Sequence, residues 1–272
     1  MRRRPQRDQQ SRSSNASNPS VASARRVGLA RAISKLGITS RSQAAQWIAD
    51  GRVRLNGALT RNPEAPVRLG IDRIEVDGHA VKPSEKIYLM LNKPRGAVTT
   101  ASDEQGRSTI YDFLPVAARG PGGQWMAPVG RLDQASEGLL LLTNDSEWAA
   151  GITAPETHLD KTYHVQVAAI ADVQLLASLR RGVNSRGEVL RVKTALHLRS
   201  GEKNSWVEIV LDEGKNRHIR RVFESLGIEV LRLLRVAIGP LVLGTLPKGA
   251  TRPLTSAEKT SLDRAIAAKS NG

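Results

Sequence analysis

The fold of this chain is decided by residues 128–145, which read PVGRLDQASEGLLLLTND. Pro128 and Gly130 indicate a turn, and the four leucines after Gly138 predict a short strand that is buried on both faces. Asp133 then lies in a loop that leads directly into the core. A carboxylate at the mouth of a rigid strand can be desolvated and oriented, which suits a catalytic acid, base or nucleophile. The alternative is an ordinary solvated loop aspartate.

The composition indicates a globular protein with a polyanionic partner. Of its 272 residues 40% are hydrophobic, but no apolar run has the length of a membrane span. The absence of cysteine excludes disulfides and thiol catalysis and fits a reducing cytoplasm. The net charge of +15 favours nucleic acid as the partner, and an anionic membrane competes less well because no basic amphipathic helix is evident. Only 3% of residues are aromatic, which favours recognition of backbone and shape over base stacking.

Residues 1–25 are rich in Arg, Ser, Asn and Gln and show no apolar periodicity. We expect a disordered basic tail. It could serve as a solubilising tail or as a loose phosphate-binding arm. An organelle transit peptide is a weaker third reading, because the segment lacks an amphipathic face.

Residues 26–82 predict a small α/β module. Apolar residues recur at helical spacing over 27–36, and Gly37 stands where a left-handed C-terminal cap belongs. Ser40 and Gln43 form a capping box for a second helix. The expected strands and turns that follow are 53–55, Asn56-Gly57, 74–76 and Asp77-Gly78.

This module carries a mainly basic set of side chains. They are Arg26, Arg31, Lys35, Arg41, Arg52 and Arg54. A charge-rich helix surface is often simply solvated. However, the order of elements, with GITSRS at 37–42 and GRVRLNG at 51–57, resembles the S4-type RNA-binding module. The resemblance implies a clamp that reads the shape of folded RNA through these six cations and has no chemistry of its own.

Residues 83–255 predict a larger domain of the α+β class on a mixed, mainly antiparallel sheet. Most of its strands are joined by short turns with few helices between them, which disfavours a doubly wound nucleotide fold. The expected elements are strands at 87–91, 163–167, 189–198, 206–211, 230–238 and 241–246, a helix around 175–179 and a helix over 216–226. Residues 256–272 are expected to form a short helical or frayed C-terminal tail.

The sequence shows no motif for a metal or a nucleotide cofactor. The five histidines lack metal-ligand spacing, and no Walker-type or dinucleotide-binding glycine pattern occurs. A nucleophile elbow is also absent, which argues against a Ser-His-Asp hydrolase. We therefore expect neither a metal nor a cofactor.

Two further segments could take part in chemistry. The helix within 212–226 has cations in its first turns, which opposes the helix dipole at about 0.3–1 kcal/mol per charge. This cost suggests a nearby anion, either RNA phosphate or an active-site carboxylate, although an ordinary basic helix is the alternative. Tyr163 shares a strand face with Val165 and Val167, so it is either a core tyrosine or a ring that packs against an extruded base.

Four motifs in this order resemble the pseudouridine synthases that modify ribosomal RNA. They are GRLD with SEGLLLLTND in 130–145, KTY at 161–163, EGKNRHIRR at 213–221 and LRLLRVAIGPL at 231–241. The last motif resembles the branch that joins an S4-type module to the catalytic domain. Small departures are His218, where glutamine is common, and Val222, where methionine is common.

This resemblance implies an isomerase that converts a uridine in RNA to pseudouridine, with Asp133 as catalytic aspartate, Tyr163 against the base and Arg220 paired with the aspartate. It further implies RNA-binding roles for Arg131, Lys215, Arg217 and Arg221. We expect a cytoplasmic monomer that acts on ribosomal RNA or an assembly intermediate after extruding the nucleotide. The rivals are a non-catalytic RNA-binding or ribosome-assembly factor and an N-glycosidase. Whether the aspartate attacks C1′ or abstracts a proton stays open.

Overall fold

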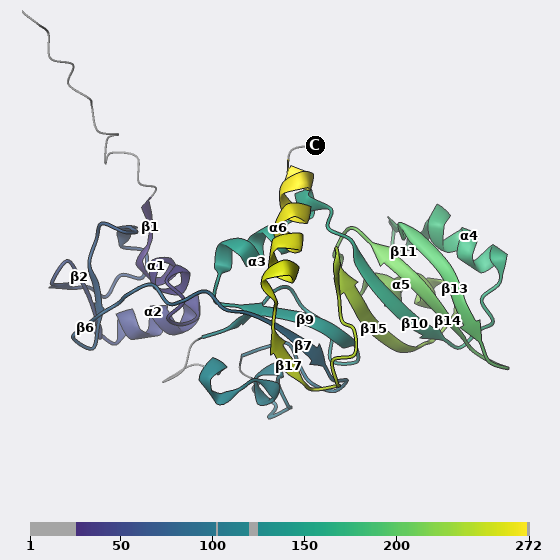
Figure 1. The fold of residues 1–272 in the computed structure, drawn as a ribbon, viewed down its shortest axis with the longest axis horizontal. Helices are drawn as coiled ribbons and strands as arrows, with labels where there is room; N and C mark the ends of the chain where they lie inside the picture. The colour runs from purple at the N-terminus through teal and green to yellow at the C-terminus, as the bar shows by residue number, and fades with distance from the viewer. Residues whose placement is uncertain (1–25, 102, 120–124, 271–272) are drawn as a thin grey trace, which may run out of the picture.

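The computed structural model describes residues 26–101, 103–119 and 125–270, and Figure 1 shows a small N-terminal module beside a larger sheet domain. The expected disordered tail at 1–25 lies outside the described residues. Within the described ranges, no helix is long and apolar enough to cross a membrane.

Both predicted helices of the N-terminal module form, but the first begins two residues later than the apolar spacing from 27 indicates, because residues 26–28 form a short strand. Helix α1 (Leu29–Lys35) is followed by Gly37 at φ +79°, a left-handed conformation that favours glycine. Helix α2 (Arg41–Ala49) begins after Ser40, whose hydroxyl accepts a hydrogen bond from the Gln43 amide at 3.1 Å. Local capping chemistry therefore marks the start of α2 and the end of α1.

The strands of this module are short. They are β1 (Arg26–Gly28), β2 (Val53–Leu55), β3 (Ala58–Leu59), β4 (Pro66–Arg68), β5 (Ile74–Val76) and β6 (His79–Ala80). Strands β3-β2-β5-β6 form one sheet, and β1 pairs with β4. Asn56 and Gly57 both have positive φ, which confirms the turn expected after β2, and this turn leads into β3, a strand that the sequence does not predict. Among these strands the sequence predicts only β2 and β5, which adjoin the turns Asn56-Gly57 and Asp77-Gly78.

A mixed sheet dominates the larger domain, as expected. Its strands are β7 (Tyr88–Lys93), β8 (Ala127–Pro128), β9 (Glu137–Thr143), β10 (Lys161–Val167), β13 (Thr194–Ser200), β14 (Ser205–Leu211), β15 (Val230–Ile238), β16 (Leu241–Val242) and β17 (Thr251–Pro253). The main path runs β13-β14-β10-β15-β9-β7-β17, with β8 beside β9 and β16 beside β15. Only β9 and β15 pair in parallel among these described strands.

Strand β9 is the buried centre of this sheet. All of its residues are buried, which confirms the prediction from the leucine run. Leu139 and Leu141 pack into one hydrophobic cluster, whereas Leu140 and Leu142 pack into another on the opposite face. The loop that carries Asp133 is thus attached to a strand held between two apolar cores.

The predicted strand at 189–198 is wrong, because the chain forms two strands there. Strand β12 (Glu188–Leu190) pairs with β11 (Val183–Ser185) in a separate hairpin, and β13 joins the main sheet. Leu190 and Val192 are buried at even positions, whereas Ala195 is buried at an odd one. Since side chains in a strand alternate with period two, this change of parity requires a break.

The strand expected at 241–246 is also shorter than predicted, because β16 ends at Val242. Gly244 then takes a positive φ of 62°, which turns the chain away from the sheet.

The helices of the larger domain cover parts of the sheet. They are α3 (Ser146–Thr153), α4 (Val173–Arg181), α5 (His218–Ser225) and α6 (Ser256–Ser270), with 3₁₀ turns η2 (Ile110–Phe113), η3 (Val116–Ala118) and η4 (Pro155–Thr157). Helix α6 occupies the segment expected to be helical or frayed and lies beside α3 (Figure 1). Its Leu262 is fully buried, and Asp263 accepts a hydrogen bond from the Trp148 indole at 2.9 Å. Packing therefore holds this helix against the sheet domain.

Candidate active site

The loop between β8 and β9 holds Asp133 in a restrained position. The Thr99 hydroxyl donates to the carbonyl of Leu132 at 2.7 Å, and the Ser136 amide donates to the carbonyl of Asp133 at 2.9 Å. Gly130 has φ +72° and begins the loop. Asp133 itself is partly buried. Its backbone is therefore anchored on both sides, which limits the directions that its carboxylate can take.

Lys93 supports this loop from beneath. The strand expected at 87–91 extends to Lys93, which ends β7 and is fully buried. Its ammonium donates to the carbonyls of Pro94, Asp133 and Ser136 at 3.1, 3.1 and 2.9 Å. Burial lowers the pKa of Lys93 to about 8, against the opposing influence of the Asp133 carboxylate. In the sequence, only the position of Lys93 near the end of a predicted strand indicates that it could support the Asp133 loop.

Asp133 and Tyr163 line the same cavity, of about 680 Å³, although they lie on a loop and a distant strand. Tyr163 is partly buried on β10, and Val165 and Val167 on the same face are fully buried. This confirms the predicted alternation of the strand. Apolar walls and one aromatic ring beside a carboxylate make a compartment that can hold a base away from water.

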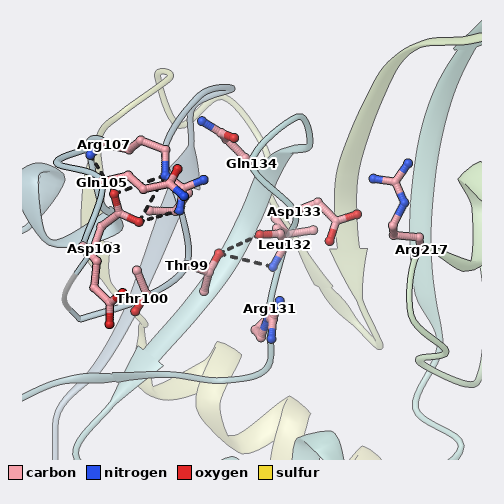
Figure 2. Close-up of a pocket in the computed structure, with 12 residues that line it drawn as sticks. Thr99, Thr100, Asp103, Gln105, Arg107, Arg131, Leu132, Asp133, Gln134 and Arg217 are labelled. Atoms are coloured by element: carbon pink, nitrogen blue, oxygen red, sulfur yellow. Dashed lines mark hydrogen bonds and ion pairs between the residues drawn. The ribbon is translucent and has the colours of Figure 1, made fainter.

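A second cavity, of about 560 Å³, lies on another side of Asp133 and is bordered by the segment 98–107. Arg131, Leu132, Asp133 and Arg217 line both cavities. Figure 2 shows the Arg217 guanidinium and the Asp133 carboxyl directed toward one another across the gap. Asp133 thus stands where two cavities meet, with cations from two segments beside it.

The sequence predicts that Arg220 pairs with Asp133, but in the described structure Arg220 contacts the Asp133 loop without forming that ion pair. Its guanidinium donates to the carbonyls of Ala135 at 3.0 Å and Val230 at 3.3 Å, and no ion pair joins it to Asp133 in the described structure. Burial lowers the pKa of Arg220, Arg217 lowers it further, and Asp133 raises it. Arg220 therefore contacts the backbone of the Asp133 loop and not the carboxylate itself.

Two of the four cations predicted to bind RNA near the site are held by protein carboxylates. Lys215 pairs with Glu213 at 2.9 Å and with Glu188 at 3.3 Å, and Arg221 pairs with Glu188 at 2.8 Å. The cations in the first turns of α5 predict a nearby anion, and these two glutamate carboxylates supply part of that negative charge. Arg217 precedes α5 with φ 48° and is exposed, as is Arg131. The latter two cations remain available to a ligand.

Of the six basic residues predicted to bind RNA in the N-terminal module, some are held by protein partners and the others are exposed. Lys35 pairs with Glu147 of α3 at 2.7 Å, and Arg52 pairs with Asp77 while its guanidinium lies 5.0 Å from the centre of the Trp47 ring. The Arg54 side chain donates to a backbone carbonyl. The remaining three are exposed, namely Arg26, Arg31 and Arg41.

No group of three or more histidines, aspartates or glutamates with metal-binding geometry occurs among the described residues. The ionisable groups around Asp133 are instead mostly cations, which suits an anionic or carbonyl-rich ligand.

Comparison with family models identifies two matches. A model described as RNA pseudouridylate synthase matches residues 87–225, and the S4 domain model matches residues 27–70. The first match contains both Asp133 and Tyr163. The second covers the helix pair and most strands of the N-terminal module.

Relatives in bacteria are similar over most of their length. The ribosomal large subunit pseudouridine synthase B of Bacillus subtilis (strain 168) is 37% identical over 241 residues, which covers 88% of this chain and 96% of the relative. An uncharacterized RNA pseudouridine synthase of Aquifex aeolicus (strain VF5) is 35% identical over 244 residues, covering 89% and 96%.

A solved structure is also similar. It is described as a crystal structure of pseudouridylate synthase, with a TM-score of 0.61 and 32% sequence identity, and the match covers 87% of this chain and 99% of that one. The similarity therefore includes the module and the sheet domain together.

Proposed function

We propose that this chain, which belongs to the RNA pseudouridylate synthase family, converts a specific uridine of ribosomal RNA to pseudouridine with Asp133 as the catalytic carboxylate. The observation that carries the proposal is that Asp133 and Tyr163, from a loop and a distant strand, line one cavity. The relatives named above are described as a ribosomal large subunit pseudouridine synthase and an RNA pseudouridine synthase, which supports an RNA substrate.

In this reaction the bond between N1 and C1′ breaks, the uracil turns while bound, and C5 bonds to C1′. The proton on C5 is lost and a proton is gained at N1, so the base keeps its composition. Because the step is an isomerisation, it consumes no co-substrate, and we propose that no cofactor takes part.

A carboxylate suits this chemistry for the reason that it suits glycosidases, since it weakens a glycosidic bond. Unlike a glycosidase, the enzyme must also exclude water so that the detached base recombines. Apolar residues of the cavity, including Leu233 and Ile238, support this requirement. Attack at C1′ and proton abstraction near it both require Asp133 beside the sugar.

Access to the cavity requires extrusion of the target nucleotide, because a stacked base cannot enter it. We propose that Arg131 and Arg217, both exposed at the cavity, contact the phosphates on either side. The module at 26–82 would add sequence-independent affinity for folded RNA through Arg26, Arg31 and Arg41.

We further propose a domain organisation of 26–82 for RNA binding and 83–255 for catalysis, in a protein that acts as a cytoplasmic monomer. The match of the S4 model to 27–70 supports the first unit.

The direct test uses ribosomal RNA labelled with tritium at uracil C5, isolated from cells that lack this protein. The wild type should release tritium, whereas Asp133→Asn should bind the same RNA and release none. The matched control is Asp172→Asn, because Asp172 caps α4 by accepting from the Leu175 amide, which asparagine can also do. Wild-type turnover by Asp133→Asn would refute the assignment.

The rival functions give different products. An N-glycosidase would liberate free uracil and leave abasic RNA, and a non-catalytic assembly factor would bind RNA without any release of tritium. Mapping pseudouridines in cells with and without the protein identifies the target uridine and its ribosomal subunit.

A further inference from the structure

Arg235 is a buried cation in the wall of the 680 Å³ cavity. It lies on β15 with 6% of its surface exposed, and its Nε donates to the carbonyl of Leu139 at 2.8 Å. Its Nη2 atom is buried and has no hydrogen-bond partner, and no carboxylate among the described residues forms an ion pair with it. Polar atoms in this situation are rare in folded proteins, because an unpaired buried charge is unfavourable.

The backbone places Arg235 directly beside Tyr163. The two residues are opposite partners in the antiparallel pair of β15 and β10, so their side chains share a sheet face and line the same cavity. On the other side Arg235 is the parallel partner of Gly138. A Cβ at Gly138 would collide with the backbone of Arg235, so only glycine allows the two strands to approach this closely. The backbone of Arg235 is therefore fixed beside that of Tyr163, and its side chain is tethered by the bond to the Leu139 carbonyl.

A second cation reinforces this wall. Lys161 is two residues before Tyr163 on β10 and lines the same cavity. Burial lowers the pKa of Lys161, and the nearby Arg235 lowers it further, whereas Asp160 and Asp212 oppose this change. Asp160 is itself paired with Lys193 at 2.8 Å. The wall beside the tyrosine is thus positive and only weakly compensated.

We propose that Arg235 donates a hydrogen bond to a carbonyl oxygen of the target uracil and stabilises the negative charge that the base carries after it detaches. This inference rests on the proposed function. When the bond from N1 to C1′ breaks, the electron pair leaves with the base, and its charge is shared by N1, O2 and O4. When C5 bonds to C1′ this charge is consumed, and Arg235 stays protonated throughout.

Two arguments favour the base over a phosphate as the ligand. First, a base that packs against Tyr163 would have its edge near the adjacent Arg235, whereas Arg131 and Arg217 are exposed at the cavity and are better placed for phosphates. Second, a rigid donor in a site shielded from water is the arrangement that best stabilises charge that develops during a reaction.

The first test is Arg235→Met, which removes the charge and keeps a side chain of similar length. We expect single-turnover tritium release from the labelled ribosomal RNA to slow about 100-fold, as on loss of an oxyanion donor, with the Kd for RNA changed less than threefold. Arg235→Lys keeps the charge, so its rate of tritium release should fall less than that of Arg235→Met. Arg180→Met is the matched control, because Arg180 is exposed on α4 and lines neither cavity; it should react like the wild type.

Unchanged release by Arg235→Met would overturn the inference, and so would a loss confined to the Kd, which would instead indicate a phosphate ligand. If the wild type released no tritium, the proposed function itself would fail, so the two failures are distinguishable. Thermal unfolding shows whether each variant is folded.

A second test needs no variant that could unfold. An RNA hairpin that spans the mapped uridine is prepared with uracil, 2-thiouracil or 4-thiouracil at that position, each labelled with tritium at C5. Each RNA is then incubated with the wild-type protein. Since sulfur is a weaker acceptor, one thio substitution should slow release at least tenfold more than the other. Equal rates for the two thio bases would contradict a directed hydrogen bond from Arg235.

Discussion

The most buried cations near the Asp133 loop are held by different partners from those that hold the ion-paired cations of the N-terminal module. Lys93, Arg220 and Arg235 are wholly or half buried and donate to backbone carbonyls. By contrast, Lys35 and Arg52 lie nearer the surface and pair with carboxylates. A carbonyl satisfies the hydrogen-bond donors of a cation but leaves its net charge intact, whereas a carboxylate cancels that charge.

This difference separates two uses of positive charge. In the cavity, low polarity and fixed geometry preserve a strong field for a substrate that develops negative charge. On the module, water and salt screen each cation, so we expect affinity for RNA to arise from many weak phosphate contacts. Four predictions test the comparison, beginning with the largest effect.

Arg220→Met should slow tritium release by about 10²–10³-fold, because it removes the positive charge behind the Asp133 loop. The Kd for RNA should change little, since Arg220 lines neither cavity in the described structure. Single-turnover release and filter binding measure the two quantities. A variant with weakened binding and normal chemistry would place Arg220 with the surface cations.

Lys93 should give stability a distinctive pH dependence. Its pKa of about 8 lies below the ordinary 10.5, so between these values the unfolded state binds more protons and the free energy of unfolding rises with pH. Across this pH range we expect the free energy of unfolding of the wild type to rise by up to about 3 kcal/mol relative to that of Lys93→Met. Denaturant unfolding at pH 7.5, 9 and 10.5 measures the difference. A constant difference would mean that Lys93 is not desolvated.

Replacing Arg31 and Arg41 together with glutamine should weaken RNA binding about tenfold at physiological salt, which is about 1.4 kcal/mol. The slope of log K against log salt should fall by about 2, because two exposed phosphate contacts are lost. Tritium release at saturating RNA should be unchanged. An altered rate at saturation would show that the module acts on chemistry as well as on affinity.

Glu147→Gln should have the smallest effect, because it removes only the exposed ion pair from α3 to Lys35. We expect a loss below about 1 kcal/mol in the free energy of unfolding. Lys35 lowers the pKa of Glu147, so the loss should be present at neutral pH and disappear as pH falls below the ordinary carboxyl pKa. Glu156→Gln, an exposed change on η4, is the control. A larger loss, insensitive to 1 M salt, would contradict the surface character of this pair.

Much of the fold was predictable because its signals are local. The Ser40 cap, the Asn56-Gly57 turn and the leucine run of β9 each depend on neighbours within a few residues. The same holds for Asp133 and Tyr163, whose candidate roles came from motifs and strand alternation. The break at 193 was missed, because a continuous apolar pattern does not reveal which strand each half will pair with.

The partners of the buried cations were not predictable. Arg220 donates to a carbonyl 85 residues earlier in the chain, and Arg235 to one 96 residues earlier. No short-range pattern encodes such contacts, since any carbonyl can accept from any cation.

The sequence by itself determined the fold class, the family and the residues able to perform chemistry, because these follow from periodicity, capping and motif. Only the tertiary structure decided which cations keep an uncancelled charge at the cavity. That depends on which carbonyls, carboxylates and solvent surround each side chain after strands far apart in the sequence have packed together.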